Sequence, residues 1–268
     1  MKIYMMTDLE GVSGVVDFEN RVDDSRENQR KRAIMRRLLT GEVNAAIQGL
    51  FEGGATEVIV NDGHGSGYTI DFEEIDPRVT VIHGTQRSFW LPDLDATCDA
   101  TILVGAHARA GTPRGVLYHT QSKDVKRTTV NGMEIGEMGQ QALIAGHYGV
   151  PMVLVTGDVA ACAEASELIA GIETVAVKKG FSRHFAAAIP PKRARGMIRQ
   201  GACNAVGKIK KIAPLRLKPP YVWRDELFAQ AYEPGVTQAG SAVVIDRNTR
   251  EFHADNIIDL VCKAFGYA

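Results

Sequence analysis

The chain has 268 residues, of which 45% are hydrophobic and 24% charged, with a formal net charge of -1. This length suits one large domain or two modest ones with a sizeable core. The near-neutral charge excludes a general attraction to nucleic acid or to an anionic membrane, so neither is expected as a partner. There is no apolar run of about eighteen residues and no signal-peptide pattern at the start.

The four cysteines are scattered, at Cys98, Cys162, Cys203 and Cys262. No Cys-x-x-Cys pair occurs, so the sequence indicates neither a zinc ribbon nor a thioredoxin-like motif. Reduced, mostly buried thiols are typical of a cytoplasmic protein, which is the location we predict.

Short apolar runs alternate with helical patterns over most of the chain. A strand is predicted over residues 1–7, and a helix over 24–53, in which Gly41 is a possible break. Further strands are predicted at 56–62, 79–83, 100–105, 115–119, 126–130, 151–156 and 173–177, and further helices at 134–147 and 160–170. This alternation indicates an α/β fold of three layers, with a largely parallel sheet and helices on both faces. We place this domain at residues 1–180.

The character of the sequence changes after about Phe181. Two Pro-Pro pairs, at 190–191 and 219–220, enclose a basic helical segment. Strand-like stretches follow at 227–232 and 242–245, and a closing helix is expected at 256–265. We interpret residues 181–268 as a smaller α+β portion that packs on the first domain and takes part in oligomer contacts.

Side chains with metal-binding chemistry follow several of the predicted strands. Asp8 and Glu10 come directly after the first strand, and His64 and His107 each follow a later one. Because the carboxyl ends of parallel strands meet at one edge of a sheet, we expect these groups to gather there. Glu137 lies at the start of a predicted helix. Taken singly, each residue also has an ordinary explanation as a cap, a hydrogen-bonded imidazole or a partner of the helix dipole.

These five residues, Asp8, Glu10, His64, His107 and Glu137, combine carboxylates and imidazoles without a thiol. Such a set suits Zn²⁺, Mn²⁺ or Fe²⁺ better than a structural tetrathiolate zinc site. Five donors exceed the needs of one catalytic ion and fit two ions that share one carboxylate. Two ions of this kind acidify a bound water and polarise a carbonyl or phosphoryl oxygen.

Five motifs occur in a fixed order over residues 1 to about 160. They are TDLEGVSG at 7–14, NDGHG at 61–65, GAHARAGTP at 105–113, LYHT at 117–120 and NGMEIGE at 131–137. A weaker similarity covers residues 175–183. In this order and spacing the motifs resemble the zinc-dependent D-aminopeptidase family of the bacterial dipeptide-transport operon.

The resemblance implies a binuclear zinc site, with Mn or Co as alternative metals. Asp8 matches the bridging carboxylate, Glu10 and His107 match ligands of one ion, and His64 and Glu137 match ligands of the other. His119 matches the catalytic histidine. The family further implies a cytoplasmic homodecamer of two pentameric rings, whose active sites face an inner chamber.

The predicted activity is metal-dependent removal of the N-terminal residue from short peptides or amino-acid amides, and the resemblance implies D-amino-acid substrates. A water activated by two zinc ions attacks, assisted by His119 as proton shuttle or oxyanion stabiliser; a nucleophilic His119 is the alternative. Asp62 and Arg109 either support the metal ligands or contact the substrate carboxylate, or they are structural.

Two other functions compete with this interpretation. In a haloacid-dehalogenase-like, Mg-dependent phosphatase, Asp8 is the nucleophile and Asp158 belongs to a later acidic motif, but the histidines then have no role. A non-catalytic metal- or ligand-binding ring protein is the second alternative. A screen of amino-acid amides and dipeptides with added metal separates these cases.

Overall fold

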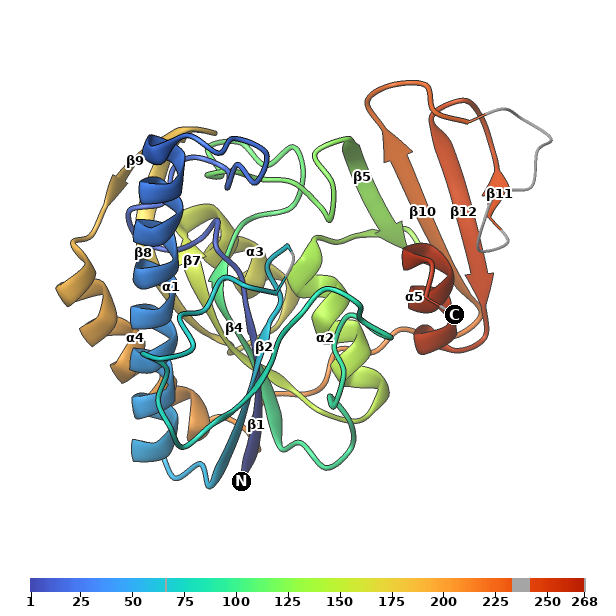
Figure 1. The fold of residues 1–268 in the computed structure, drawn as a ribbon. Coiled ribbons are helices and arrows are strands. Elements are labelled where there is room, and N and C mark those ends of the chain that lie inside the picture. Colours follow the sequence, from blue (N-terminus) through green and yellow to red (C-terminus); the bar gives the residue numbers. More distant parts are fainter. Residues whose placement is uncertain (66, 233–241, 268) are drawn as a thin grey trace.

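The computed structural model describes residues 1–65, 67–232 and 242–267, which form two sheets and five helices (Figure 1). The first sheet has seven strands in the order β3-β2-β1-β4-β7-β8-β9. Their bounds are β1 Lys2–Thr7, β2 Glu57–Asp62, β3 Thr80–Ile82, β4 Ala100–Ala106, β7 Met152–Asp158, β8 Glu173–Ser182 and β9 Phe185–Ala188. All neighbours are parallel except β8 and β9. The predicted α/β fold with a largely parallel sheet is confirmed.

The central strands are buried because helices cover both faces of the sheet. β4 and β7 are buried at every position, which is why their sequences are continuous apolar runs rather than alternating ones. The helices are α1 Arg26–Glu52, α2 Glu137–His147, α3 Val159–Leu168, α4 Pro191–Val206 and α5 Ile257–Phe265. α1 and α4 lie side by side on one face, and α2 and α3 lie on the other (Figure 1).

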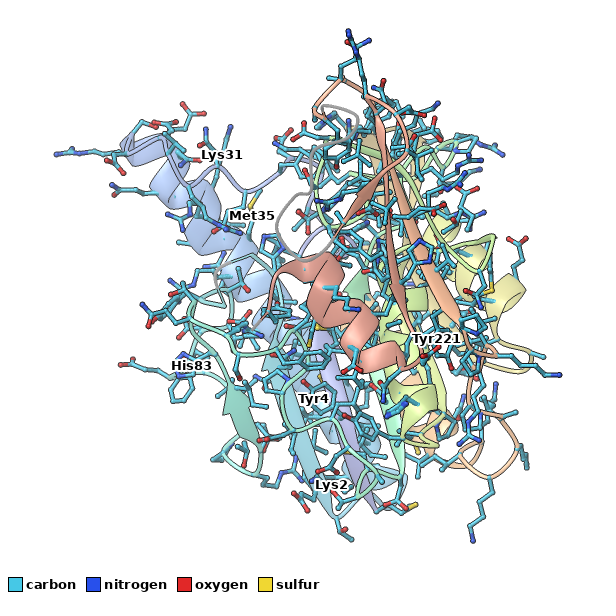
Figure 2. The ribbon with its side chains drawn as sticks, turned by 90° about the vertical axis from the view of Figure 1, so that its right-hand side faces the viewer. Lys2, Tyr4, Lys31, Met35, His83 and Tyr221 are labelled. Carbon is cyan, nitrogen blue, oxygen red and sulfur yellow. The ribbon has the colours of Figure 1, made fainter. Side chains whose placement is uncertain are left out.

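α1 runs unbroken through Gly41, which lies against the Arg195 side chain of α4. Its start is fixed by Ser25, whose side chain accepts a hydrogen bond from the backbone N–H of Asn28. The first half of α1 stands away from the rest of the molecule, as the positions of Lys31 and Met35 show in Figure 2.

The second sheet is antiparallel, in the order β11-β12-β10-β5-β6. Its strands are β5 Val125–Val130, β6 Met133–Glu134, β10 Tyr221–Leu227, β11 Val243–Val244 and β12 Thr249–Ala254. α5 packs on β10 and β12 and also contacts α2 (Figure 2). The Phe265 ring of α5 makes edge contacts with Trp223 of β10 and with Trp90, which precedes β4. This aromatic cluster joins the second sheet to the first.

The predicted boundary after residue 180 does not coincide with the division between the sheets. It falls inside β8, and β9 and α4 also belong with the first sheet, whereas β5 and β6 lie in the second. The basic residues of α4 suggested a separate unit. However, α4 also has an apolar stripe of Ala194, Ile198, Ala202 and Ala205, which is fully buried.

Two strand predictions were wrong. Residues 115–119 form a loop, in which the φ of 53° at Leu117 is incompatible with a strand. The stretch predicted at 227–232 lies mostly after the true strand β10, in which Trp223 and Asp225 are buried and Arg224 between them is exposed. β9 and β12 were not predicted; β11 covers part of the stretch predicted at 242–245, of which Ala242 adjoins residues that the structure does not describe.

Among the described residues, no helix combines the length and the apolar character needed to cross a membrane.

Candidate metal centre

The candidate site lies where the order of the strands reverses. After β1 the chain adds β2 and β3 on one side, then adds β4 and β7 on the other. Open α/β sheets bind ligands at the carboxyl ends of the strands around such a point. Asp8 follows β1, His107 follows β4, and His64 follows β2, so three neighbouring strands each deliver one side chain.

The donor atoms form two groups of three, each with its atoms within 4.8 Å of one another. The first, which we call the Asp8 cluster, consists of Asp8, Glu10 and His64. The second, the Glu137 cluster, consists of His107, His119 and Glu137.

Asp8 links the two clusters. Its Oδ1 lies 3.0 Å from His64 Nδ1, and its Oδ2 lies 3.3 Å from His107 Nε2. His64 Nδ1 is also 3.0 Å from a Glu10 oxygen, and His107 Nε2 is 3.3 Å from Glu137. One carboxylate with an oxygen directed into each cluster has the arrangement of a bridging ligand. The ligand grouping implied by the resemblance is different, since here Glu10 lies with His64, and Glu137 with His107.

The acids of the site favour positive charge on the imidazoles of His64 and His107. Burial opposes a charged His107, but Glu137 and Asp8 outweigh burial and raise the pKa of His107 to about 10. Burial likewise disfavours charge on Asp8, yet His107 and His64 hold the pKa of its carboxyl well below the usual range. The pKa of His64 is raised in the same way, by Glu10 and Asp8 against the effect of burial.

The residues fit a divalent metal. Glu10 Oε2, His64 Nε2 and His107 Nε2 are buried, and although oppositely charged atoms lie within ion-pair distance, none of the three has a hydrogen bond of acceptable geometry among the described residues. Such atoms are costly unless another ligand satisfies them. Imidazole and carboxylate donors without a thiol match the ligand sets of catalytic zinc. Metal binding would displace the protons that the acids now hold on the rings.

Each histidine is fixed by the ring nitrogen that points away from its cluster. His107 and His119 direct Nδ1 to the backbone oxygens of Ala108 and Leu117, both at 2.9 Å, which leaves Nε2 for the site. His64 is turned the other way. Its Nδ1 faces the acids, and its Nε2 lies 3.6 Å from a Glu19 oxygen.

Glu19 was not a predicted site residue. Its side chain is only 4% exposed and pairs with Arg21 at 2.6 Å and with Arg32 of α1 at 2.9 Å. A carboxylate behind a metal-binding histidine fixes the tautomer and raises the basicity of the ring. No local sequence signal marks Glu19, because it lies in an irregular loop and reaches His64 only through the fold.

The loop after β1 is pressed against the end of β4. The backbone N–H of Gly11 donates to the Gly105 oxygen at 2.7 Å. A Cβ at Gly11 would lie 2.0 Å from the Ala106 oxygen, and one at Gly105, where φ is 81°, would lie 2.0 Å from the Asp8 oxygen. Glycine at both positions therefore lets the two ligand-bearing segments meet.

Two buried charged residues hold the ligand loops from behind. Lys178 on β8 donates to the backbone oxygens of Glu10, Val12 and Val15. Burial lowers its pKa to about 8, although the surrounding acids favour its charge. Asp158 accepts from the backbone N–H of Val116 and so anchors the loop that carries His119. The sequence signal that could have identified Lys178 as a buried charge is its position in an apolar strand.

A cavity of about 980 Å³ opens over both clusters. Its lining includes Asp8, Glu10, His64, His119 and Glu137. His107 lies behind them and stacks on the His119 ring, with ring centres 3.9 Å apart. The far end of the chain reaches the same cavity through Tyr267. The cavity is large enough for a substrate the size of a short peptide.

Asp62 and Arg109 have structural contacts. Both Asp62 oxygens accept hydrogen bonds from Thr69, and one also accepts from the Ile70 N–H. Arg109 lies within ion-pair distance of Glu134 and Glu164 and is not part of the cavity lining.

A family model described as D-aminopeptidase, Peptidase_M55, matches residues 1–264. The chain belongs to this family. The D-aminopeptidase of Bacillus subtilis (strain 168) is 37% identical to it over 217 residues, which is 80% of this chain and 77% of that protein. The solved structure of the Zn-dependent D-aminopeptidase DppA from Bacillus subtilis, a self-compartmentalizing protease, matches with a TM-score of 0.88 and 30% identity. That match covers 100% of this chain and 96% of the other.

The resemblance seen in the sequence is thereby confirmed, and the phosphatase alternative is not favoured. The DppA structure aligns with the whole of this chain, so the second sheet is part of the fold that the two proteins share.

Proposed function

We propose that the protein is a zinc-dependent aminopeptidase that removes the N-terminal residue, preferentially a D-amino acid, from short peptides or amino-acid amides. The observation that carries the proposal is the pair of donor clusters joined by Asp8 at the floor of the cavity. The family membership and the zinc-dependent relative support the same activity.

Two ions per chain fit the donors best. Asp8, Glu10 and His64 would hold one ion, and His107 and Glu137 would hold the other with Asp8 shared, which leaves His119 of the Glu137 cluster available for proton transfer. When bound, two zinc ions supply Lewis-acid polarisation of the scissile carbonyl and acidify water. Mn and Co remain alternatives that the donor set also accepts.

His119 is the residue that we propose moves the proton to the leaving amine. Its Nδ1 is committed to the Leu117 oxygen, so Nε2 is the atom that exchanges a proton on the cavity side. Stacking on His107 and the edge contact with Phe18, at 5.5 Å between ring centres, hold the ring in place. His119 Nε2 is 3.7 Å from Glu137, which orients the imidazole further.

We further propose a homo-oligomer, built as a decamer of two pentameric rings. The relative is a self-compartmentalizing protease, and this chain exposes an aromatic pair at the edge of its first sheet. Phe181 and Phe185 are 51% and 65% exposed, with ring centres 5.3 Å apart. The molar mass in solution tests this.

The cytoplasmic location stays a prediction. The four free cysteines agree with it, because reduced thiols are typical of that compartment.

The activity is tested by incubating zinc-loaded protein with matched D- and L-amino-acid amides and dipeptides. We expect hydrolysis of the D-substrates, loss of activity on chelation and recovery with zinc. A phosphate ester with Mg²⁺ serves as the control reaction. Turnover of the ester alone, or no turnover of any peptide or amide at any metal load, would contradict the proposal.

A further inference from the structure

Among the described residues that line the cavity, one cationic side chain, that of Lys123, is not engaged by an ion pair or hydrogen bond to the protein. Arg21, Arg87 and Lys123 are the lysines and arginines of its lining. Arg21 pairs with Glu19, and its terminal nitrogen packs against Gly65. Arg87 donates to the Asn61 side chain and to the backbone oxygens of Asp62 and Gly84.

Lys123 has a different environment. It is exposed, and its Nζ lies 5.1 Å from the centre of the Phe18 ring. Within the described part of the chain, no carboxylate lies within ion-pair distance of it and no side-chain hydrogen bond from it is formed. Arg183 also contacts Phe18, but it donates to the Tyr118 oxygen and does not line the cavity.

The position of Lys123 relates it directly to His119. The two lie four residues apart on one loop, and the Phe18 ring contacts both. The acids of the cavity lining, Asp8, Glu10, Glu19 and Glu137, lie among or beside the metal ligands, and the two other cations, Arg21 and Arg87, are already engaged by protein groups. Charge is therefore distributed unevenly along the cavity: the acids and metal ligands lie on one side, and the cation of Lys123 lies beyond His119.

We propose that Lys123 binds the C-terminal carboxylate of a short peptide, on the leaving-group side of the bond that is cut. The inference rests on the proposed function and narrows its substrate class to short peptides with a free carboxylate, rather than amides. In a dipeptide, three bonds separate the scissile carbonyl carbon from the carboxylate carbon, a distance of at most about 4 Å. A lysine that follows the proton-transferring histidine along the cavity wall is placed to pair with that group.

The test compares D-alanyl-glycine with D-alanyl-glycinamide, which contains the same scissile bond but no carboxylate. Zinc-loaded wild-type protein should prefer the free acid. In Lys123→Met, the apolar stem over Phe18 is retained and the charge is lost. We expect kcat/KM for the free acid to fall about tenfold or more, mainly through KM, because a charge-assisted hydrogen bond is removed. The value for the amide should stay within about twofold.

Lys123→Arg should retain the preference for the free acid. Lys126→Met, which removes a charge outside the cavity that pairs with Glu226, is the matched control and should leave both rates unchanged. An equal loss on both substrates, or no loss on either, overturns the role of Lys123 while hydrolysis itself still supports the proposed function. If wild-type protein cleaves neither compound, the proposed function and this inference fall together.

Discussion

The two donor clusters differ in their exposure and in how the chain holds them. The Asp8 cluster lines the cavity but is the less exposed of its two faces, with the side chains of Asp8, Glu10 and His64 10%, 4% and 9% exposed, and it has Glu19 and Lys178 behind it. The Glu137 cluster opens towards the cavity, because the side chains of His119 and Glu137 are 14% and 16% exposed. The buried cluster is thus built for retention of a cation, and the open one for contact with substrate.

This difference assigns separate roles to histidines of the same chemistry. His64 is held by a carboxylate at its far nitrogen, whereas His107 and His119 are held by backbone oxygens. A carboxylate makes the ring a stronger ligand than a carbonyl does. Of the three histidines, His119 has the most exposed side chain and contacts the same Phe18 ring as Lys123, which suits it for proton transfer rather than for permanent coordination.

Asp8→Ala should have the largest effect on metal content and turnover, because Asp8 has an oxygen directed into each cluster. We expect the metal content to fall from about two ions per chain to near zero. Turnover should fall below detection, a larger loss than the roughly 10- to 100-fold expected for an outer-shell change. The exposed Asp255→Asn is the control. Retention of one tightly bound ion in Asp8→Ala would show that the clusters are independent.

His119→Ala tests whether the open cluster uses this histidine for chemistry. We expect kcat to drop by roughly 10²- to 10⁴-fold while the metal content is unchanged. His253→Ala, at the exposed surface of β12, should leave kcat unaffected. Loss of about one ion per chain in His119→Ala would make the residue a ligand instead of a proton carrier.

Glu19→Gln tests whether Glu19 strengthens metal binding by His64 in the Asp8 cluster. The neutral side chain no longer stabilises the Nε2–H of His64, so the affinity for the ion in the Asp8 cluster should fall about 10- to 100-fold. Competition with a chromophoric chelator measures this without reference to activity. Glu27→Gln removes an exposed acid of α1 and should change nothing. Equal affinities in Glu19→Gln and wild type would reduce Glu19 to a partner of Arg21 and Arg32.

The smallest expected effect on metal binding and turnover concerns Glu42 of α1, which accepts from the Ser13 N–H behind the loop after β1 and is expected to alter stability instead. Burial raises its pKa from 4.5 to about 7, against the opposing influence of Lys178 and Arg195. A raised carboxyl pKa contributes stability below about pH 4.5 that is lost as the pH rises through 7. Glu42→Gln should therefore be as stable as wild type at low pH and more stable above pH 8, by about 3 kcal/mol, since one pKa unit is worth about 1.4 kcal/mol.

Unfolding by urea at several pH values measures this difference, with Glu73→Gln as an exposed control. The contribution of metal binding to the pH dependence is common to wild type and variant and cancels in the comparison. If the free energies of unfolding of Glu42→Gln and wild type differed by the same amount at all pH values, Glu42 would not be the source of the pH dependence.

The sequence predicted the parallel sheet and the place of the site because both depend on local patterns. Continuous apolar runs mark β4 and β7, and strand ends mark Asp8, His64 and His107. Glu137 was accessible through its motif and its position at a helix start. The ligand grouping, by contrast, depends on side-chain directions that no spacing contains.

Long-range contacts explain what the sequence did not predict. Glu19 reaches His64 across a gap of 45 positions in an irregular loop. The second sheet joins Val125–Val130 to strands nearly a hundred positions later, so a boundary drawn along the chain could not separate the sheets. α4 appeared separate because its charges are conspicuous in the sequence, while its packing uses alanines.

The number of metal ions per chain is the most direct test of two ion sites that share Asp8. Protein loaded with zinc, freed of excess metal and analysed by elemental mass spectrometry should contain about two zinc ions per chain, both lost on prolonged chelation together with the activity. One ion per chain in fully active protein would contradict two clusters joined by Asp8, and activity that persists without metal would contradict the account altogether.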